Sequence, residues 1–458
     1  MVPDHVASYP DHVMRAARAI GDGGGRAFVV GGAVRDRLLG MPVQDVDLEV
    51  YGVPADKLLR LARRMGRADL VGQSFGIIKL RLPGGELDLS LPRREHKQDR
   101  GHKGFLVATD PGMDPRLACA RRDLTINAML EDPLRGEVLD FFGGQNDLRD
   151  GVLRHVSAAF GEDPLRSLRV VQLAARLRFR VAAETLAVAG ALDLGELPRE
   201  RIGAEFDKLL LGALAPSWGL EVLRAMGALR FFPELAALIG CAQEPEHHPE
   251  GDVWTHTLLA LDRAAWLRPS SPRARVLLLA VLCHDLGKPA TTTSECGRIR
   301  CSNHDVVGER IARTFLDRLT TEVKVIEEVA ALVRDHLAPM QLHRAPNVGD
   351  GAIRRLALHV DLQQLVLTAC ADHLGRTRAD DGFPAGRWLS ARAAALRLPP
   401  NGPTPILLGR HLLERGYRPG PRLGAILADV FERQLDGAIK DLDAAIAYAL
   451  AQHPPDAG

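Results

Sequence analysis

Two aspartates one residue apart, Asp45 and Asp47, could hold a divalent cation near the start of the chain. They lie in the run VQDVDLEVYG, whose composition is typical of a β-strand. Because residues i and i+2 of a strand point to the same face, such a strand would aim both carboxylates into one site. Paired carboxylates bind hard cations, and two-metal sites use them to activate an attacking hydroxyl and stabilise a leaving pyrophosphate. The spacing therefore predicts an Mg²⁺ site with Asp45 and Asp47 as catalytic ligands.

A glycine turn upstream could place a triphosphate beside these carboxylates. The run AFVVGGAVRDRLLG reads as a strand, a turn at Gly31 and Gly32, and a helix, so backbone N–H groups at the turn can face a phosphate. A Gly-Gly turn alone more often only reverses the chain, and the aspartates that follow favour the functional interpretation. Asp88, in ELDLSLPRRE, either supplies a third carboxylate or is an ordinary exposed strand residue.

A basic stretch, RRDLTIN, carries Arg121 and Arg122 and ends at Asn127. Its guanidinium donors and polar, turn-forming end suit phosphates or a ribose, although a basic helix start would look the same. The Gly- and Asp-rich run from Asp140 to Gly151 reads as a structural turn that leads out of the sheet.

The run EDPLRSLR is the most informative, because it opens a helix and spaces Asp163, Arg166 and Arg169 at i, i+3 and i+6. On one helix face, the carboxylate can accept from an exocyclic amino group while an arginine donates to the adjacent ring nitrogen. Cytosine and adenine offer that pattern, whereas uracil and guanine reverse it. The face therefore predicts selection of C or A without a nucleic-acid template. The alternative is an Asp–Arg salt bridge within the helix, which is commoner for such pairs.

Together, in this order, the motifs from Ala27 to Leu211 closely resemble the class II tRNA nucleotidyltransferases and their bacterial poly(A) polymerase relatives. The resemblance implies a polymerase-β-like nucleotidyltransferase head, a helical neck with the base-selecting Asp163 and Arg166, and body and tail helices that hold tRNA. RERIGAEFDKLL matches the family's last neck motif. By the same resemblance, Asp45 and Asp47 are the metal ligands and the nucleotide contacts are Gly31, Gly32, Arg35, Arg121, Arg122, Asn127, Asp163, Arg166 and Arg169.

One position departs from the family pattern, because Gln172-Leu173 stands where the family usually has Arg-Phe. The change weakens one expected phosphate contact and bears on nucleotide preference. Family members add CCA, CC alone, A alone or poly(A), and CC-only members tend to shorten the loop that corresponds to the segment from Pro92 to Ala120. That segment is not short here, which argues against CC-only addition and leaves the other three activities open.

A second set of metal-binding side chains lies on successive helix-like segments of the later chain. Imidazoles and carboxylates that converge from several helices suit a divalent transition metal. The spacing resembles the HD phosphohydrolase superfamily, whose H…HD…D signature maps to His256, His284, Asp285 and Asp372, and two further histidines would extend the site to a dinuclear centre, His304 and His336. A complete ligand set implies hydrolysis of 2′,3′-cyclic or 2′-phosphate RNA ends. The alternative is a degenerate HD domain kept as a scaffold.

Two cysteines flank GRIR in what reads as a hairpin, Cys296 and Cys301. A C-x₄-C spacing without a second pair is weak evidence for zinc, and two buried thiols are the better expectation.

The elements that must position these residues change character along the chain. Short β-rich runs alternate with helical stretches from Ala27 to about Phe142, and from about Ala158 nearly every segment has apolar residues at helical spacing. The predicted fold class is α+β, with a nucleotidyltransferase head followed by an all-α neck, body, HD domain and tail. The predicted domains are 1–155 for the head, 156–243 for neck and body, 244–397 for the HD domain and 398–458 for the tail, with the polar stretch EPEHHPEG read as a boundary.

Length and composition agree with a multidomain globular enzyme of 458 residues, with 46% apolar and 26% charged residues. No apolar run could cross a bilayer, no secretory signal is seen, and six scattered cysteines fit a reducing compartment, so we expect a cytoplasmic location. The expected activity is CCA addition to the 3′ end of tRNA from CTP and ATP, with HD phosphohydrolase activity beside it. The alternatives are A-only or poly(A) addition to RNA 3′ ends, and an HD phosphohydrolase whose head only binds RNA.

Overall fold

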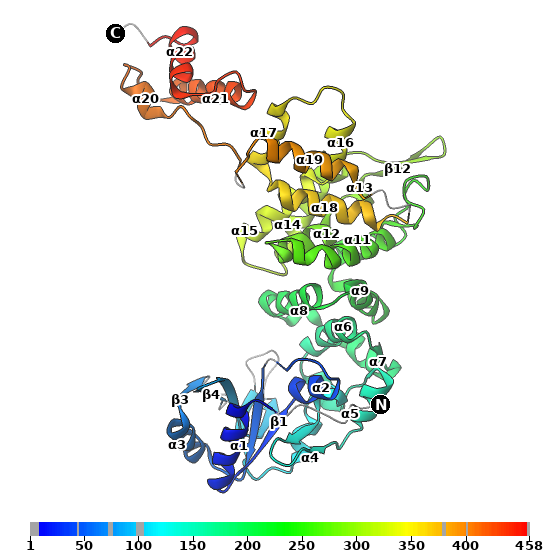
Figure 1. Ribbon diagram of the computed structural model, residues 1–458. Helices are drawn as coiled ribbons and strands as arrows, with labels where there is room; N and C mark the ends of the chain where they lie inside the picture. The colour runs from blue at the N-terminus through cyan, green and yellow to red at the C-terminus, as the bar shows by residue number, and fades with distance from the viewer. Residues whose placement is uncertain are drawn as a thin grey trace. The chain divides into compact units, whose positions relative to one another are not determined.

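The protein divides into two compact units, Met1–Glu205 with Trp218–Phe231, and Phe206–Ser217 with Phe232–Gly458. The computed structural model describes residues 9–43, 45–71, 77–97, 105–377, 382–399 and 402–455. Figure 1 shows the β-strands of the sheet in the first unit and the helices of the second. No helix among the described residues has the length and apolar character needed to span a bilayer.

A seven-stranded sheet forms the centre of the first unit, in the order β3-β4-β5-β2-β1-β8-β9. β1 pairs antiparallel with β2 and β8, and β2 pairs parallel with β5. The strand β1 is buried at four of its five residues, as expected for a central strand. The strands are β1 (Arg26–Val30), β2 (Asp47–Tyr51), β3 (Arg67–Val71), β4 (Ile77–Leu82), β5 (Gly85–Ser90), β8 (Leu130–Asp132) and β9 (Glu137–Leu139), with two separate pairs, β6 (Arg93–Lys97) with β7 (Phe105–Thr109) and β10 (Val152–Leu153) with β11 (Arg180–Val181).

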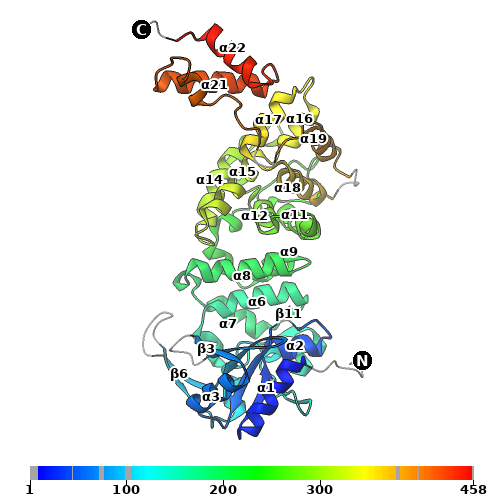
Figure 2. The same cartoon turned by 60° about the vertical axis from the view of Figure 1, so that its left-hand side comes forward.

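Amphipathic helices cover this sheet. α1 buries Val13, Ala16, Ala17 and Ile20, which recur at helical spacing, and packs on β1 and α3. The view in Figure 2 shows α1, α2 and α3 beside the strands. The helices are α1 (Asp11–Asp22), α2 (Gly32–Leu38), α3 (Ala55–Met65), α4 (Pro115–Ala120), α5 (Gly144–Asp150), α6 (Leu165–Leu177) and α7 (Ala183–Ala191), followed by α8 (Arg199–Gly212) and α9 (Pro216–Ala225), whose residues are shared between the two units.

The second unit is mainly helical, and α12 (Ala274–Cys283) is at its core. All residues from Val276 to Cys283 are buried, so this helix is apolar on every side and contacts α11, α15 and α18. A short hairpin, β12 (Thr292–Glu295) with β13 (Arg298–Cys301), follows it. The other helices are α10 (Pro233–Ala236), α11 (Val253–Leu267), α13 (Lys288–Thr291), α14 (His304–Leu316), α15 (Val323–Asp335), α16 (Ala338–Arg344), α17 (Asp350–His359), α18 (Leu362–Gly375), α19 (Pro384–Ala395), α20 (Gly409–Leu413), α21 (Pro421–Leu435) and α22 (Leu442–Gln452).

The predicted α+β class, with a sheet first and helices after it, is confirmed. The prediction missed β3, which is exposed at four of its five residues, and β8, which is only three residues long and too short to show a period. The predicted hairpin around GRIR is present as β12 and β13. Cys296 at its turn is exposed, however, and Cys301 is only half-buried, so the prediction of two buried thiols was wrong.

Candidate active sites

The Gly-Gly turn joins β1 to α2 and is flanked by two guanidinium groups. Gly31 has φ 71°, a left-handed conformation that favours glycine. A Cβ built on Gly31 would lie 3.5 Å from Arg122 Nη1, and one on Gly32 would lie 3.3 Å from Arg35 Nη2. The turn therefore presents backbone beside two fixed cations, as a phosphate site requires.

The predicted catalytic aspartates lie at the start of β2. Asp47 is the first residue of this strand and stands directly opposite Asp88 on β5. The expectation that Asp45 also lies in the strand was wrong, because β2 begins two residues later. Desolvation and the carboxylates of Asp88 and Asp45 raise the pKa of Asp47, while Arg122 opposes the shift. No three carboxylates of this unit lie within 4.8 Å among the described residues, but their mutual repulsion is the kind that a bound cation relieves.

A chain of hydrogen bonds ties the predicted nucleotide contacts together. Arg35 Nη1 donates to Asn127 Oδ1 at 2.8 Å, and Asn127 Nδ2 donates to Asp123 Oδ1 at 3.1 Å. Arg169 Nε completes the chain by donating to Asp123 Oδ2 at 2.7 Å. Burial alone would raise the pKa of Asp123, but Arg169 and the hydrogen bonds from Asn127 and the Leu124 amide lower it. The buried carboxylate is therefore ionised and fixes residues from α2 and α6.

The two residues predicted to select the base, Asp163 and Arg166, are arranged differently from the prediction. α6 begins at Leu165, so Asp163 precedes the helix and is not on the same helix face as Arg166. Asp163 accepts from the Leu165 amide at 3.1 Å and from Arg201 at 3.0 Å, so the alternative of an Asp163–Arg166 bridge is not seen either. Arg201 belongs to the RERIGAEF motif, which therefore anchors the Asp163 carboxylate.

Arg166 is held by backbone carbonyls. Its Nη1 donates to the Ala159 carbonyl at 2.5 Å and its Nη2 to the Arg121 carbonyl at 2.8 Å. Arg121 itself pairs with Glu162 at 2.9 Å. Gln172, which departs from the family pattern, is buried and accepts a hydrogen bond from Arg176 at 3.2 Å, one turn further along α6. Part of the segment from Pro92 to Ala120, residues 98–104, lies outside the described residues.

In the second unit, helix ends deliver most of the predicted metal-binding residues. His284 and Asp285 follow the last residue of α12, His336 follows α15, and His304 begins α14. His256 lies in α11 and Asp372 in α18, two helices that pack together. A Cβ on Gly287 would lie 2.0 Å from the His304 carbonyl oxygen, so only glycine lets the turn after Asp285 approach α14 so closely.

Three of the histidines are fixed in the same way. His284, His304 and His336 each place Nδ1 2.7 to 2.8 Å from the carbonyl oxygen three residues earlier, in Val281, Cys301 and Val333. The carbonyls of Val281 and Val333 lie in the last turns of α12 and α15, where they lack intrahelical partners and can accept, whereas Cys301 is the last residue of β13. Each Nδ1 thus donates a proton to a carbonyl, and Nε2 is the nitrogen that the ring can offer to a metal.

All six predicted residues converge into one buried cluster. The six residues form two groups, each with its ligand atoms within 4.8 Å of one another: His256, His284 and Asp372, and Asp285, His304 and His336. Asp285 Oδ2 connects the two groups, because it lies 3.1 Å from His284 Nε2 and 3.8 Å from His256 Nε2. Both carboxylate oxygens of Asp285, and Nε2 of His284 and of His304, are buried with no hydrogen-bond partner among the described residues. Unsatisfied atoms of this kind are expected where a cation belongs, so the donor set fits a divalent transition metal.

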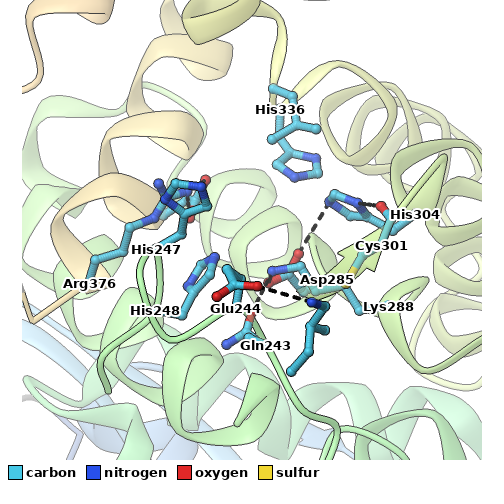
Figure 3. A pocket seen from close by; sticks show the side chains of 13 residues that line it. Gln243, Glu244, His247, His248, Asp285, Lys288, Cys301, His304, His336 and Arg376 are labelled. Carbon is cyan, nitrogen blue, oxygen red and sulfur yellow. Dashed lines mark hydrogen bonds and ion pairs between the residues drawn. The ribbon is translucent and has the colours of Figure 1, made fainter. Parts of the chain in front are cut away.

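A pocket opens onto this cluster and is lined by basic side chains (Figure 3). Lys288 Nζ lies 2.7 Å from Asp285 Oδ2 as an ion pair without hydrogen-bond alignment, and it donates to Gln243 at 2.6 Å. Arg376 pairs with Asp372 at 3.2 Å. Although burial opposes it, His284 and Lys288 hold the pKa of Asp285 well below its usual range, so the carboxylate is ionised.

The sequence interpretation missed the other residues of this pocket. The stretch that it read as a domain boundary supplies three lining residues, Glu244, His247 and His248, and also the nearby Glu250. Lys288 is part of the motif HDLGKP but carried no predicted role. The sequence did contain a signal, two adjacent histidines close to the first HD-type histidine. It was missed because the polar composition of this stretch was read as a domain boundary.

Comparisons with known proteins match both the head segment and the HD segment of the chain. The profile of the poly A polymerase head domain matches residues 27–154 and that of the HD domain matches residues 253–377. The multifunctional CCA protein of Halorhodospira halophila is 38% identical over 94% of this chain and 98% of its own length, and that of Methylococcus capsulatus is 39% identical over 81% and 87%.

Solved structures show the same fold at lower identity. The CCA-adding enzyme of Bacillus stearothermophilus in complex with CTP aligns with a TM-score of 0.61 at 19% identity, over 96% of each chain. The Thermotoga maritima CCA-adding enzyme complexed with tRNA aligns with a TM-score of 0.58 at 19% identity, over 98% of this chain and 97% of that one.

Proposed function

The chain belongs to the family of the multifunctional CCA proteins, and on that premise we propose that its head adds C and A nucleotides from CTP and ATP to the 3′ end of tRNA, with an HD phosphohydrolase beside it. One observation supports the head activity most strongly: the Gly31-Gly32 turn lies beside Arg35, which begins a buried chain of hydrogen bonds that ends at Arg169. It links a phosphate site to the helix that follows the base-selecting residue.

In the head, Asp45 and Asp47 are the proposed Mg²⁺ ligands, with Asp88 opposite Asp47. Bound Mg²⁺ would lower the pKa of the attacking 3′-hydroxyl and stabilise the negative charge on the triphosphate and on the leaving pyrophosphate. Arg35 and Arg122 flank the turn and would contact the phosphates.

Base selection falls to Asp163 and Arg166. Each carboxylate oxygen of Asp163 already accepts one hydrogen bond and has a second lone pair for an exocyclic amino group. Arg166 uses two nitrogens on carbonyls, and a guanidinium has five N–H donors, so it can still donate to a ring nitrogen. The existing contacts would fix the orientation of both side chains for hydrogen bonding to cytosine or adenine. They therefore preorganise the site and do not use up the donors and acceptors that the base needs.

In the HD site, the proposed metal ligands are the six clustered residues, and a bound divalent transition metal would supply Lewis-acid activation of water. Lys288 and Arg376 place positive charge beside the ligands and would bind the phosphate of the substrate. A pocket that combines these cations with buried carboxylates suits a phosphate ester, such as a 2′,3′-cyclic or 2′-phosphate RNA end.

Incorporation assays test the head. Transcripts of tRNA that end at the discriminator base, after one C, or after CC are offered CTP and ATP separately. We expect CTP incorporation on the first two and ATP incorporation on the third. Incorporation of ATP alone on all three would contradict C addition and favour A-only or poly(A) synthesis.

A phosphate-release assay tests the HD site. A 2′,3′-cyclic nucleotide should be hydrolysed by the protein, and chelation should abolish that activity. If hydrolysis persisted in a protein freed of metal, the HD assignment would fall.

A further inference from the structure

Glu250 is a buried carboxylate that two imidazoles share. Its side chain is 1% exposed, and Oε1 lies 2.8 Å from His256 Nδ1 and 2.9 Å from His248 Nδ1. One buried carboxylate oxygen therefore faces both rings.

His256 differs from the other three clustered histidines in how its Nδ1 is satisfied. Those three donate to a backbone carbonyl three residues earlier. His256 lies within α11, where the equivalent carbonyl, that of Val253, already accepts from the Thr257 hydroxyl at 2.8 Å. The carboxylate of Glu250 takes the place of that carbonyl. This acceptor holds the proton on Nδ1 and leaves Nε2 facing Asp372 at 3.0 Å.

We propose that Glu250 is the positioning residue of the HD metal site: it fixes the tautomer and ring orientation of His256 and makes its Nε2 a stronger metal donor. Outer carboxylates that accept from a ligating imidazole act in this way in metal sites generally. The assignment rests on the proposed phosphohydrolase function, because it requires that His256 binds a metal.

The shared oxygen also couples the metal site to the wall of the pocket. His248 lines the pocket, and its ring meets that of His256 edge to face with centroids 4.8 Å apart. Glu250 thus contacts one imidazole of the ligand cluster and one that lines the pocket (His248 is labelled in Figure 3). Loss of Glu250 should weaken both metal binding and substrate binding, whereas loss of His248 should weaken substrate binding only.

A titration with Co²⁺ tests this directly. The full-length protein is stripped of metal and titrated in excess Mg²⁺, which occupies oxygen sites but competes poorly for imidazole; the visible absorption of Co²⁺ reports affinity and geometry. Glu250→Ala should weaken Co²⁺ binding by roughly 10- to 100-fold and alter the spectrum. Glu250→Gln keeps an acceptor oxygen and should lose less.

Two further variants separate the roles. Glu309→Gln makes the same chemical change on α14, where the carboxylate pairs with Arg313 and Arg334, and should leave Co²⁺ affinity unchanged. His248→Ala should keep the Co²⁺ affinity and raise KM for a 2′,3′-cyclic nucleotide.

Three other results would each overturn part of the proposal. Glu250→Ala protein that binds Co²⁺ as wild type does, with the same spectrum, would overturn the positioning role even if hydrolysis were lost, and would leave the proposed phosphohydrolase standing. Wild-type protein that shows no imidazole-type Co²⁺ spectrum would overturn the metal site and the positioning role together. A Glu250→Gln variant as weak as Glu250→Ala would show that charge, not hydrogen bonding, sets the affinity, and would overturn the tautomer argument.

Discussion

The substitution Asp123→Asn should lower nucleotidyl transfer while sparing phosphohydrolysis. Asp123 accepts hydrogen bonds from the Leu124 amide, from Asn127 and from Arg169, and no other carboxylate stands between α2 and α6 in this chain of contacts. An asparagine keeps the shape but offers one acceptor oxygen, and its amide group would face a donor. The link to Arg169 or to Asn127 is then broken.

The size of the effect follows from the environment of the lost contact. A hydrogen bond to a charged group contributes about 1.5–3 kcal/mol. The Arg169 side chain is 43% exposed, so water replaces part of the interaction and the lower end applies. If about 1.5 kcal/mol of positioning is lost in the transition state, kcat/KM for CTP addition should fall about tenfold.

The second activity of the chain provides the internal control. Transfer is measured by CTP incorporation into a tRNA transcript, and hydrolysis by phosphate release from a 2′,3′-cyclic nucleotide, on the same preparation. Transfer at the wild-type rate would refute the role of the chain of hydrogen bonds. An equal loss of both activities would show general unfolding instead.

Three further perturbations test other parts of the account. Gly287→Ala should abolish hydrolysis and destabilise the protein by about 1–3 kcal/mol in urea unfolding, because its Cβ would lie 2.0 Å from the His304 carbonyl oxygen. The control Gly424→Ala, whose Cβ would have nothing within 4 Å, should be neutral or slightly stabilising. Equal stabilities of the two variants would contradict the close packing at Gly287. Asp163→Ala should reduce discrimination of CTP and ATP against UTP and GTP in incorporation assays, and unchanged discrimination would remove Asp163 from base selection. Because folding lowers the pKa of Asp123, the contribution of Asp123 to stability is complete above its unfolded pKa of about 3.9 and is lost as the pH falls through the folded pKa. The difference in unfolding free energy between wild type and Asp123→Asn should therefore close below about pH 4 in acid-unfolding curves. A difference that widened there would contradict the ion pair.

The sequence was most informative where spacing along one element determines geometry. Gly31 and Gly32 lie at the expected strand–turn–helix junction. The six HD-type residues, expected on successive helix-like segments, lie in helices or at helix ends and converge. These patterns depend on residue type and short-range spacing, which a sequence displays directly.

Contacts between distant segments could not be predicted in this way. Asp163 meets Arg201, 38 residues away, and no local pattern distinguishes that pair from a bridge within the helix. Glu250 was hidden for a different reason, since a polar, proline-bearing stretch ordinarily marks a surface loop, and only the fold of α11 against it buries the carboxylate. The roles of these residues stay predictions until they are measured.

The most direct test of the central claim, that the chain carries two separate active sites, is to measure both activities in two variants. Asp45→Ala should lose CTP and ATP incorporation and keep hydrolysis of a 2′,3′-cyclic nucleotide, whereas His284→Ala with Asp285→Ala should lose hydrolysis and keep incorporation. Incorporation that survived Asp45→Ala, or hydrolysis that survived the double substitution, would contradict the account.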